Sequence, residues 1–229
     1  MKAALVTGGS SGIGIAIARG LREDGYDLTL VSRRAERVEP AAAELGVHGI
    51  AADVSKEDEA ERAVAEHRER FGRLDVLVNS AGIGVAGRIE DLQTKHFDLQ
   101  IGVNLRGLFL VTRAALPLLR ESRGHVVNLA SIAGTLPTPG LATYGATKAA
   151  VIALTRSLNA EVEGDGIRAT ALCPGFVDTP MAQWSGVPAE EMIQPEDCAE
   201  LVRALLRLSP YARVPQIVVE RVGSGDLPG

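Results

Sequence analysis

The chain has 229 residues, 29 acidic and 24 basic, and its net charge of −5 argues against a nucleic-acid binder, which usually carries a basic excess. Apolar residues make up 46% and charged residues 23%, close to globular averages, so wholesale disorder is excluded. Uninterrupted apolar runs fall far short of the ~18–20 residues of a membrane span, and those after Lys2 are too short for a signal peptide, so we expect a cytoplasmic protein without membrane contact.

Short β-branched or leucine-rich runs alternate with longer helical segments along the whole chain. Near-continuous apolar runs are typical of a parallel sheet that is covered on both faces. The predicted strands span residues 3–7, 28–32, 47–52, 74–79, 125–130, 167–172 and 216–220, and the predicted helices span 12–23, 38–45, 56–71, 94–120, 142–162 and 196–208. Six crossovers between seven parallel strands predict a doubly wound α/β fold. Because the strands occupy the whole chain, we expect a single domain over residues 1–229.

Two of the predicted helices, 94–120 and 142–162, carry apolar side chains on more than one face. A surface helix needs one apolar stripe, and a sheet covers one side of a helix. The second apolar side either belongs to a deep core helix or meets another subunit. We favour the subunit contact and expect a homodimer or homotetramer that pairs through these two helices.

The cysteines and histidines give no sign of a metal site. Cys173 and Cys198 form no CxxC pair, and in a cytosolic chain they predict reduced, buried thiols. The histidines lack the spacing of metal ligands. Aromatic residues, at 3%, are too few for a surface that stacks bases. We therefore expect neither a metal nor a nucleic-acid partner.

Glycines fill the turn between the first strand and the first helix. The sequence there is Gly8-Gly9-Ser10-Ser11-Gly12-Ile13-Gly14, with the spacing G-x-x-x-G-x-G rather than G-x-G-x-x-G. Such glycines let the backbone approach a pyrophosphate, and a helix N-terminus offers free N–H groups and a positive dipole. The turn predicts a dinucleotide site; the alternative is a plain glycine-rich turn.

The end of the second strand carries two arginines. A site for NAD places an acidic residue about 20 residues after the glycine motif, where it binds the ribose 2′-hydroxyl. Here the sequence reads Ser32-Arg33-Arg34, without a carboxylate. Guanidinium groups suit a 2′-phosphate because of their forked donors. We therefore predict NADP, with NAD possible, over the alternative of a solvated basic loop.

Polar residues also follow the third and fourth strands. Asp53 either accepts a hydrogen bond from an adenine amino group or braces the turn into the next helix, where Ser55 has the character of an N-cap with acidic residues after it. The segment 79–82, Asn-Ser-Ala-Gly, is either a wall of the cofactor cleft or an ordinary turn.

Ser131, Tyr144 and Lys148 form a candidate catalytic set. Ser131 follows the fifth strand, and Tyr144 and Lys148 are four residues apart on one helix face. A tyrosine has a pKa near 10, and a neighbouring ammonium lowers it, so the phenol can exchange a proton with an alcohol or carbonyl oxygen. Asn104 lies inside the long predicted helix; without further information its amide could simply be satisfied by the backbone.

Together these motifs resemble the short-chain dehydrogenase/reductase family. The matching residues are Thr7-Gly8-x-x-x-Gly12-Ile13-Gly14, Asn79-x-Ala81-Gly82, Asn104, Ser131, Tyr144-x-x-x-Lys148 and Pro174-Gly175-x-x-x-Thr179. The resemblance spans almost the whole chain. It implies a Rossmann fold with strand order 3-2-1-4-5-6-7, helices on both faces and a nicotinamide cofactor.

The resemblance also implies a role for each candidate residue. Ser131 would orient the substrate carbonyl, Tyr144 would transfer the proton, Lys148 would bind the nicotinamide ribose and lower the tyrosine pKa, and Asn104 would hold a water in a proton relay. An arginine at the place of Arg33 marks the NADP-preferring members. The implied cofactor residues are Gly8, Ser10, Ser11, Gly12, Ile13, Gly14, Arg33, Arg34, Asp53, Val54, Asn79, Ala81, Gly82, Tyr144, Lys148, Pro174, Gly175, Val177 and Thr179.

Two features depart from the family's usual pattern. Ser80 stands where a second asparagine is common, and the segment 214–222 lacks the Asp-Gly-Gly ending of members that act on acyl-carrier substrates. The ending looks more like the branch that resembles NADP-dependent 3-hydroxy acid dehydrogenases. It also puts in doubt the tetramer contact that the family builds from its C-terminal region.

We therefore expect an NADP-dependent oxidoreductase that moves hydride between nicotinamide and a carbonyl or secondary alcohol carbon. The rival is a non-catalytic dinucleotide-binding regulator, which would have no need of an activated tyrosine. The substrate pocket should form from loops 83–90, 132–140 and 177–194, the last being the substrate loop. Val85, Leu136, Met181 and Trp184 there predict a largely apolar carbonyl compound, unless Met181 and Trp184 merely anchor a mobile lid.

Overall fold

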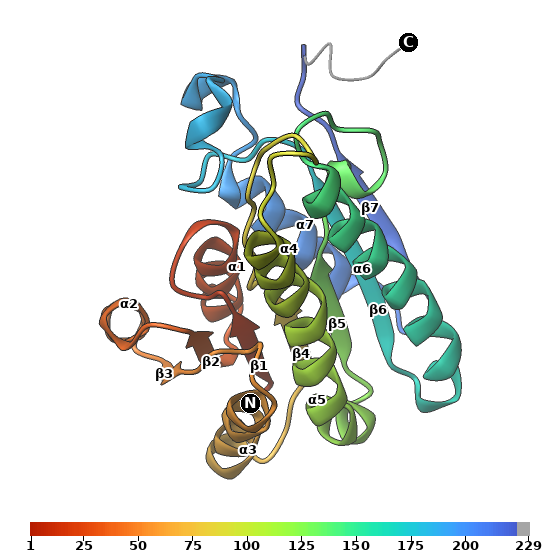
Figure 1. Ribbon diagram of the computed structural model, residues 1–229. Helices are drawn as coiled ribbons and strands as arrows, with labels where there is room; N and C mark the ends of the chain where they lie inside the picture. The colour runs from red at the N-terminus through yellow and green to blue at the C-terminus, as the bar shows by residue number, and fades with distance from the viewer. Residues whose placement is uncertain (224–229) are drawn as a thin grey trace.

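The computed structural model describes residues 1–223, without the side chain of Trp184. A sheet of seven parallel strands runs through this part of the chain in the order β3-β2-β1-β4-β5-β6-β7 (Figure 1). The strands are β1 (Ala3–Thr7), β2 (Asp27–Ser32), β3 (His48–Ala51), β4 (Val76–Asn79), β5 (His125–Leu129), β6 (Arg168–Pro174) and β7 (Gln216–Val219). The predicted doubly wound fold and its strand order are confirmed.

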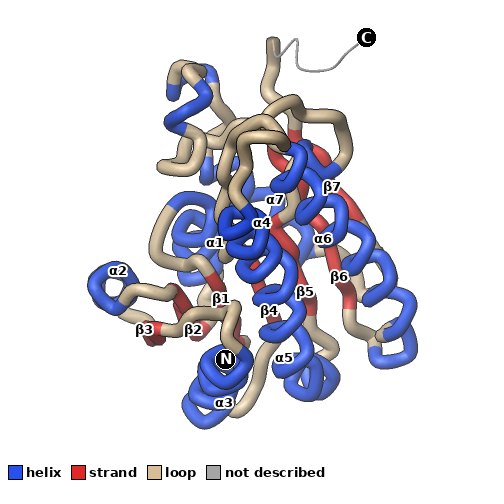
Figure 2. Tube along the Cα trace, in the orientation of Figure 1, coloured by secondary structure: helices blue, strands red, loops and turns tan. Residues whose placement is uncertain are grey.

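Helices cover both faces of the sheet. They are α1 (Gly12–Glu23), α2 (Ala35–Leu45), α3 (Glu57–Phe71), α4 (Thr94–Ile101), α5 (Leu108–Ser122), α6 (Ala142–Glu161) and α7 (Pro195–Arg207). Helices α1 and α7 pack together on one face, and α3 packs with α5 on the other. Figure 2 shows α5 and α6 in front of the strands and α7 behind them.

The central strands are buried on both sides, which explains their continuous apolar sequences. Every residue of β1, β4 and β5 is buried. Successive side chains of a strand point to opposite faces. Ala4 and Val6 therefore join the core beneath α1 and α7, whereas Leu5 joins the core beneath α3 and α5. A polar residue in these strands would lose water on either face.

The predicted helix 94–120 is interrupted. A π-helical turn, Gly102–Gly107, separates α4 from α5 and contains Asn104. A π turn accommodates an extra residue and often marks a functional position. Smaller errors occur elsewhere: α2 begins at Ala35, three residues before the predicted start, and β6 continues to Pro174.

One stretch of the described chain, Thr94–Ser122, is long and apolar enough to cross a membrane by length and composition, with a mean hydropathy of 1.3. The expectation from short apolar runs missed it, because scattered polar residues break the runs. Of its most apolar window, 44% is buried inside the protein. Leu110, Val111 and Leu119 pack in the core between the sheet and the helices α3 and α5. The core helix of a soluble protein meets the same criterion in this way.

Two histidines are buried in the core. His67 contacts Thr29 Oγ1 through Nδ1 at 2.8 Å and the Arg73 carbonyl through Nε2 at 3.0 Å. His125 contacts Thr170 Oγ1 through Nε2 at 2.9 Å. Burial lowers the pKa of His67 to about 4 and that of His125 to about 3. Both imidazoles are therefore neutral in the folded protein at neutral pH.

These histidines predict a loss of stability in mild acid. In the unfolded chain a histidine binds a proton near pH 6.5. Below that pH the unfolded state holds more protons than the folded state, so the free energy of unfolding falls as pH falls. The slope is at most about 1.4 kcal/mol per pH unit for each histidine, until the folded pKa is reached. Urea unfolding between pH 7 and pH 5 measures it. His125→Gln should give a shallower slope than the wild type; an unchanged slope would contradict the assignment.

Candidate functional site

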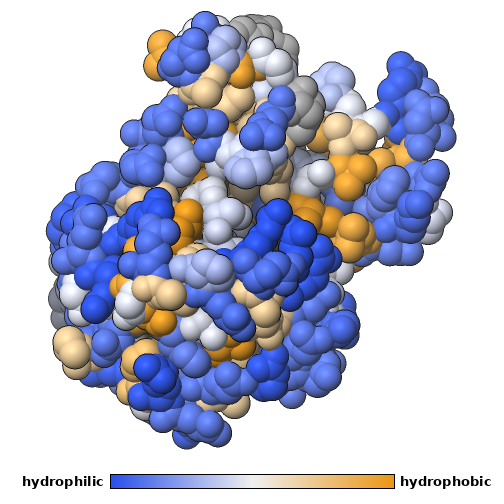
Figure 3. Space-filling model, turned by 90° about the vertical axis from the view of Figure 1, so that its left-hand side faces the viewer, coloured by the Kyte–Doolittle hydropathy of each residue, from blue (hydrophilic) through white to orange (hydrophobic). Residues whose placement is uncertain are grey.

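Two neighbouring cavities open at the carboxyl edge of the sheet, of about 450 Å³ and about 160 Å³, and Gly82 lines both. They lie where the strand order reverses, since β1 pairs with β2 on one side and with β4 on the other. In open α/β sheets ligands bind at this switch point. Most of the face seen in Figure 3 is hydrophilic, and hydrophobic side chains gather on its right-hand side.

The glycine turn is shaped so that side chains are excluded. Gly8 has a φ of +66°, and a Cβ there would lie 2.8 Å from backbone atoms of Ser80 and Ala81. A Cβ on Gly14 would lie 2.3 Å from the Gly8 carbonyl oxygen. Helix α1 begins at Gly12 without a side-chain cap from Ser11. The bare backbone and uncapped helix end fit the pyrophosphate of a dinucleotide.

Three arginines line the smaller cavity: Arg33, Arg34 and Arg37. Ser32 lines it as well, and its hydroxyl accepts a hydrogen bond from Ser10 at 2.9 Å. Arg37 was missed because the sequence placed the start of α2 three residues too late. Its spacing of three residues from Arg34 was the available signal, since residues three apart share a helix face. The cavity therefore offers a cluster of exposed cations to an anionic group.

Asp53 and Val54 also line the smaller cavity. The Asp53 carboxylate accepts hydrogen bonds from Ser55, from its N–H at 3.0 Å and from its hydroxyl at 2.7 Å. Ser55 therefore braces the turn and does not cap the helix. Helix α3 begins at Glu57, after Lys56, with acidic residues in its first turn as expected. The bracing role of Asp53 has direct contacts, and its adenine contact remains a prediction.

The residues of the segment 79–82 have different surroundings: some of them line a cavity, and one is buried in the core. Ala81 and Gly82 line the smaller cavity. Asn79, however, is buried beneath the cleft and lines neither of the two cavities described. Its amide donates to Thr112 Oγ1 and Asn128 Oδ1, both at 2.9 Å. The side chain of this last β4 residue thus lies between the sheet and α5, and the predicted contribution of Asn79 to the cofactor cleft stays a prediction.

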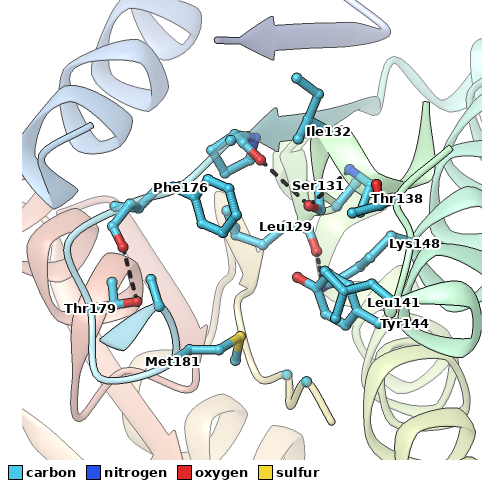
Figure 4. A pocket seen from close by; sticks show the side chains of 18 of the residues that line it. Leu129, Ser131, Ile132, Thr138, Leu141, Tyr144, Lys148, Phe176, Thr179 and Met181 are labelled. Atoms are coloured by element: carbon cyan, nitrogen blue, oxygen red, sulfur yellow. Dashed lines mark hydrogen bonds between the residues drawn. The ribbon is translucent and has the colours of Figure 1, made fainter. Parts of the chain in front are cut away.

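Ser131, Tyr144 and Lys148 come together in the larger cavity, on the side opposite Phe176 and Met181 (Figure 4). Ser131 lies two residues after the end of β5. Its hydroxyl accepts a hydrogen bond from the Ala133 N–H at 3.2 Å and lies 3.5 Å from the Pro174 carbonyl oxygen. Tyr144 and Lys148 come from the first turns of α6. The Lys148 ammonium donates to the Leu129 carbonyl at 2.7 Å, which fixes it in the wall.

The tyrosine does not have the lowered pKa that its spacing from Lys148 predicted. Burial raises the pKa of Tyr144, and a hydrogen bond with Ser131 opposes that rise. The ammonium lies over the tyrosine ring, 5.6 Å from its centroid. Burial lowers the pKa of Lys148 to about 8. Desolvation thus outweighs the hydrogen bond with Ser131, and the phenol holds its proton at neutral pH.

Asn104 lies one layer behind the cavity. Its Oδ1 accepts from the Ile83 N–H at 2.8 Å, and its Nδ2 donates to the Ile83 carbonyl at 2.9 Å and to Thr147 Oγ1 at 3.1 Å. A Cβ on Gly82 would lie 3.5 Å from both Asn104 Oδ1 and Lys148 Nζ. The structure therefore brings Asn104 close to the lysine, and the water relay remains a prediction.

The remaining wall comes from the segment after β6. Pro174, Gly175, Val177 and Thr179 line the larger cavity as predicted, together with Ile13 from the glycine turn. Of the expected substrate residues, Leu136 and Met181 line it, whereas Val85 does not appear in its lining. The side chain of Trp184 lies outside what the structure describes.

Arg221 also lines the larger cavity, although it was not among the predicted site residues. It follows β7, and its guanidinium lies 3.3 Å from Glu191 Oε2. No local spacing marks a residue that follows the last strand. Among the described lining residues, Arg221 and Lys148 are cations and none is acidic. The expectation of a largely apolar substrate therefore did not include this cation in the lining.

Comparison with known proteins gives concordant matches. Residues 2–187 match the sequence family described as short chain dehydrogenase. An oxidoreductase of Staphylococcus epidermidis, described as uncharacterized, is 38% identical over 227 residues, covering 96% of this chain and 97% of that protein. An uncharacterized oxidoreductase of Staphylococcus aureus is 36% identical over 225 residues, with the same coverage.

Two solved structures share the fold. An alcohol dehydrogenase from the archaeon Thermococcus sibiricus, complexed with 5-hydroxy-NADP, has a TM-score of 0.90 and 38% identity, covering 97% of each chain. A 3-ketoacyl-(acyl-carrier-protein) reductase from Brucella melitensis, complexed with NADH, has a TM-score of 0.89 and 32% identity, covering 96% of each chain. Both solved structures therefore share the fold of this chain over almost their whole length.

Proposed function

The chain belongs to the short chain dehydrogenase family and is an oxidoreductase, and from that premise we propose that it moves hydride between NADP and a carbonyl or secondary alcohol carbon, with Tyr144 as the acid–base group. One observation carries the proposal: Ser131, Tyr144 and Lys148 line the same cavity, and this larger cavity lies beside the smaller cavity that the glycine turn helps to line. We further propose that the predicted domain 1–229, of which residues 224–229 lie outside the described part of the chain, is a single domain and that 177–194 is its substrate loop.

A nicotinamide cofactor fits the glycine turn and would supply or accept hydride when bound. Gly8, Gly12 and Gly14 would hold its pyrophosphate, since a side chain at any of them meets neighbouring atoms. Arg33, Arg34 and Arg37 would bind a 2′-phosphate by charge-assisted hydrogen bonds. One of the similar structures contains an NADP derivative and the other NADH, so the choice of NADP depends on these arginines.

The protein's own groups would handle the proton. The Ser131 hydroxyl would hold the substrate oxygen, and the protonated Tyr144 phenol would donate to it as negative charge develops during reduction. The Lys148 ammonium, fixed over the ring, would stabilise the phenolate left behind. Asn104 would keep Ile83 and Thr147 in place around this group. In the oxidation of an alcohol the same groups would work in reverse.

A non-catalytic regulator is not favoured. Binding a nucleotide alone gives no reason to bring the Tyr144 phenol together with Ser131 in one cavity. Both thiols, Cys173 and Cys198, are buried and unpaired, which supports the proposed cytoplasmic location.

A substrate screen tests the proposed function. Absorbance of the reduced cofactor would be followed with ketones, aldehydes, hydroxy acids and secondary alcohols, each with NADP(H) and NAD(H). Because Arg221 lines the cavity, the panel should include carbonyl compounds with and without a carboxylate. Turnover of at least one carbonyl compound or alcohol supports the proposal. Tight cofactor binding without turnover across the whole panel would favour the regulator.

We also propose a homodimer or homotetramer that pairs through α4, α5 and α6. Phe97, Leu99 and Phe109 are each more than two-fifths exposed on α4 and α5. Analytical ultracentrifugation at micromolar concentration should give a dimer or tetramer mass. Phe109→Asp should shift that mass toward the monomer, because it places a charge in an apolar contact. A wild-type monomer at this concentration would rule out the proposed assembly.

A further inference from the structure

A glutamine that the mechanism does not use is buried behind the catalytic cavity. Gln100, in α4, is 0% exposed. Its Oε1 accepts a hydrogen bond from the Val85 N–H at 3.1 Å. Its Nε2 is buried and has no hydrogen-bond partner among the residues that the structure describes. A buried amide with an unpaired N–H group costs stability, and an apolar side chain in its place would avoid that cost.

Gln100 and Asn104 hold the same short segment. Asn104 makes two hydrogen bonds to the Ile83 backbone, and Gln100 binds the Val85 N–H two residues further on. The two amides are four residues apart, at the junction of α4 with the π turn. We call Ile83, Gly84 and Val85 the 83–85 wall. This wall is irregular backbone, so its position depends on these hydrogen bonds and not on a helix or sheet ladder.

The 83–85 wall lies beside the proposed acid–base residue. Gly84 lines the larger cavity, and a Cβ placed on it would lie 3.6 Å from Tyr144 Cδ2 and 3.8 Å from the Met181 sulfur. Gly84 therefore lies near both the tyrosine ring and Met181, which belongs to the segment after β6. A shift of this backbone would therefore change the space beside the Tyr144 ring.

We propose that Gln100 is a positioning residue for the reaction: through Val85 it fixes the 83–85 wall against the Tyr144 ring. The inference rests on the proposed function for its effect on turnover, whereas its effect on the wall is independent of it. The unpaired Nε2 is then the stability cost of an amide whose oxygen is needed at Val85.

Replacing Gln100 by methionine tests this, because methionine keeps the volume and removes both polar atoms. Turnover should fall about 10-fold, since small misplacements of catalytic groups cost that much or more. The melting temperature should change little, because the variant loses one hydrogen bond and one unpaired amide together. Hydrogen exchange at the Val85 amide should become faster, and the ring NMR signals of Tyr144, identified by their loss in Tyr144→Phe, should shift.

Asn159 supplies a matched control. It is another buried amide, and it holds the Ala169 backbone by two hydrogen bonds of 2.7 and 2.8 Å, outside the linings of both cavities. Asn159→Leu should lower the melting temperature and leave the turnover of the folded enzyme and the Tyr144 signals unchanged. If Gln100→Met behaves like this control, the inference is wrong.

The two readouts separate this inference from the proposed function. A wild type without turnover would contradict the proposed function, while faster Val85 exchange and shifted Tyr144 signals in Gln100→Met would still support the positioning role. Normal turnover in Gln100→Met, or unchanged exchange and ring signals, would overturn it.

Discussion

Replacing Tyr144 by phenylalanine should lower kcat at least ~10²-fold, because general acid–base catalysis contributes about 10²–10⁴-fold. The substitution removes the phenol oxygen and keeps the ring, so the position of the Lys148 ammonium over the ring is preserved. The dissociation constant of the cofactor should change little. Steady-state kinetics with the best substrate of the panel, together with cofactor titration by fluorescence, measure both quantities.

Tyr211→Phe is the matched control for this prediction. Tyr211 is 97% exposed, and loss of its hydroxyl should leave both kcat and cofactor affinity at wild-type values. A Tyr144→Phe enzyme that retains near-normal turnover would refute the role given to the phenol. Equal losses in kcat and cofactor affinity would indicate a damaged site and not a missing proton donor.

Replacing Arg33 by alanine should erase most of a preference for NADP over NAD. A charge-assisted hydrogen bond to the 2′-phosphate is worth roughly 1.5–3 kcal/mol. At about 1.4 kcal/mol per tenfold, one such contact predicts a 10- to 100-fold preference in the wild type. NAD gains nothing from the cluster because it lacks the phosphate. Dissociation constants for both cofactors should be measured at one ionic strength, since salt weakens exposed contacts.

Three further variants sharpen this cofactor test. Arg37→Ala should reduce the preference as well, because Arg37 lines the same cavity. Ser32→Asp combined with Arg33→Ala should favour NAD, by placing a carboxylate near the ribose hydroxyls. Arg68→Ala, in the last turn of α3 and outside the linings of both cavities, should have no effect. Wild-type protein that binds NAD as tightly as NADP would contradict the assignment of the arginines and leave the oxidoreductase function intact.

The fold and the catalytic set could be predicted because their signals are local. Apolar runs mark strands that are buried on both faces, and a four-residue spacing places Tyr144 and Lys148 on one helix face. The glycine turn is partly local as well, since a Cβ on Gly14 would meet the carbonyl of Gly8 in the same loop. Such patterns need no knowledge of distant contacts.

The structure differs from the predictions at positions that are determined by contacts between residues far apart in sequence. The last residue of a strand can point into the cleft or beneath it, and Asn79 turns to Thr112 and Asn128, which are far away in sequence. The spacing of Tyr144 and Lys148 could not show how far burial raises the tyrosine pKa. The π turn at Asn104 and the approach of Arg221 to the cavity likewise depend on packing between segments that are remote in sequence.

Transfer of deuterium tests the central claim most directly. The wild type would be incubated with a carbonyl substrate from the panel and NADPH that carries deuterium at both hydrogen positions of nicotinamide C4, and the alcohol product analysed by mass spectrometry. We predict one deuterium on the carbinol carbon, with the hydroxyl proton drawn from solvent through Tyr144. An alcohol product without deuterium, or no alcohol from any carbonyl compound tested, would contradict the account.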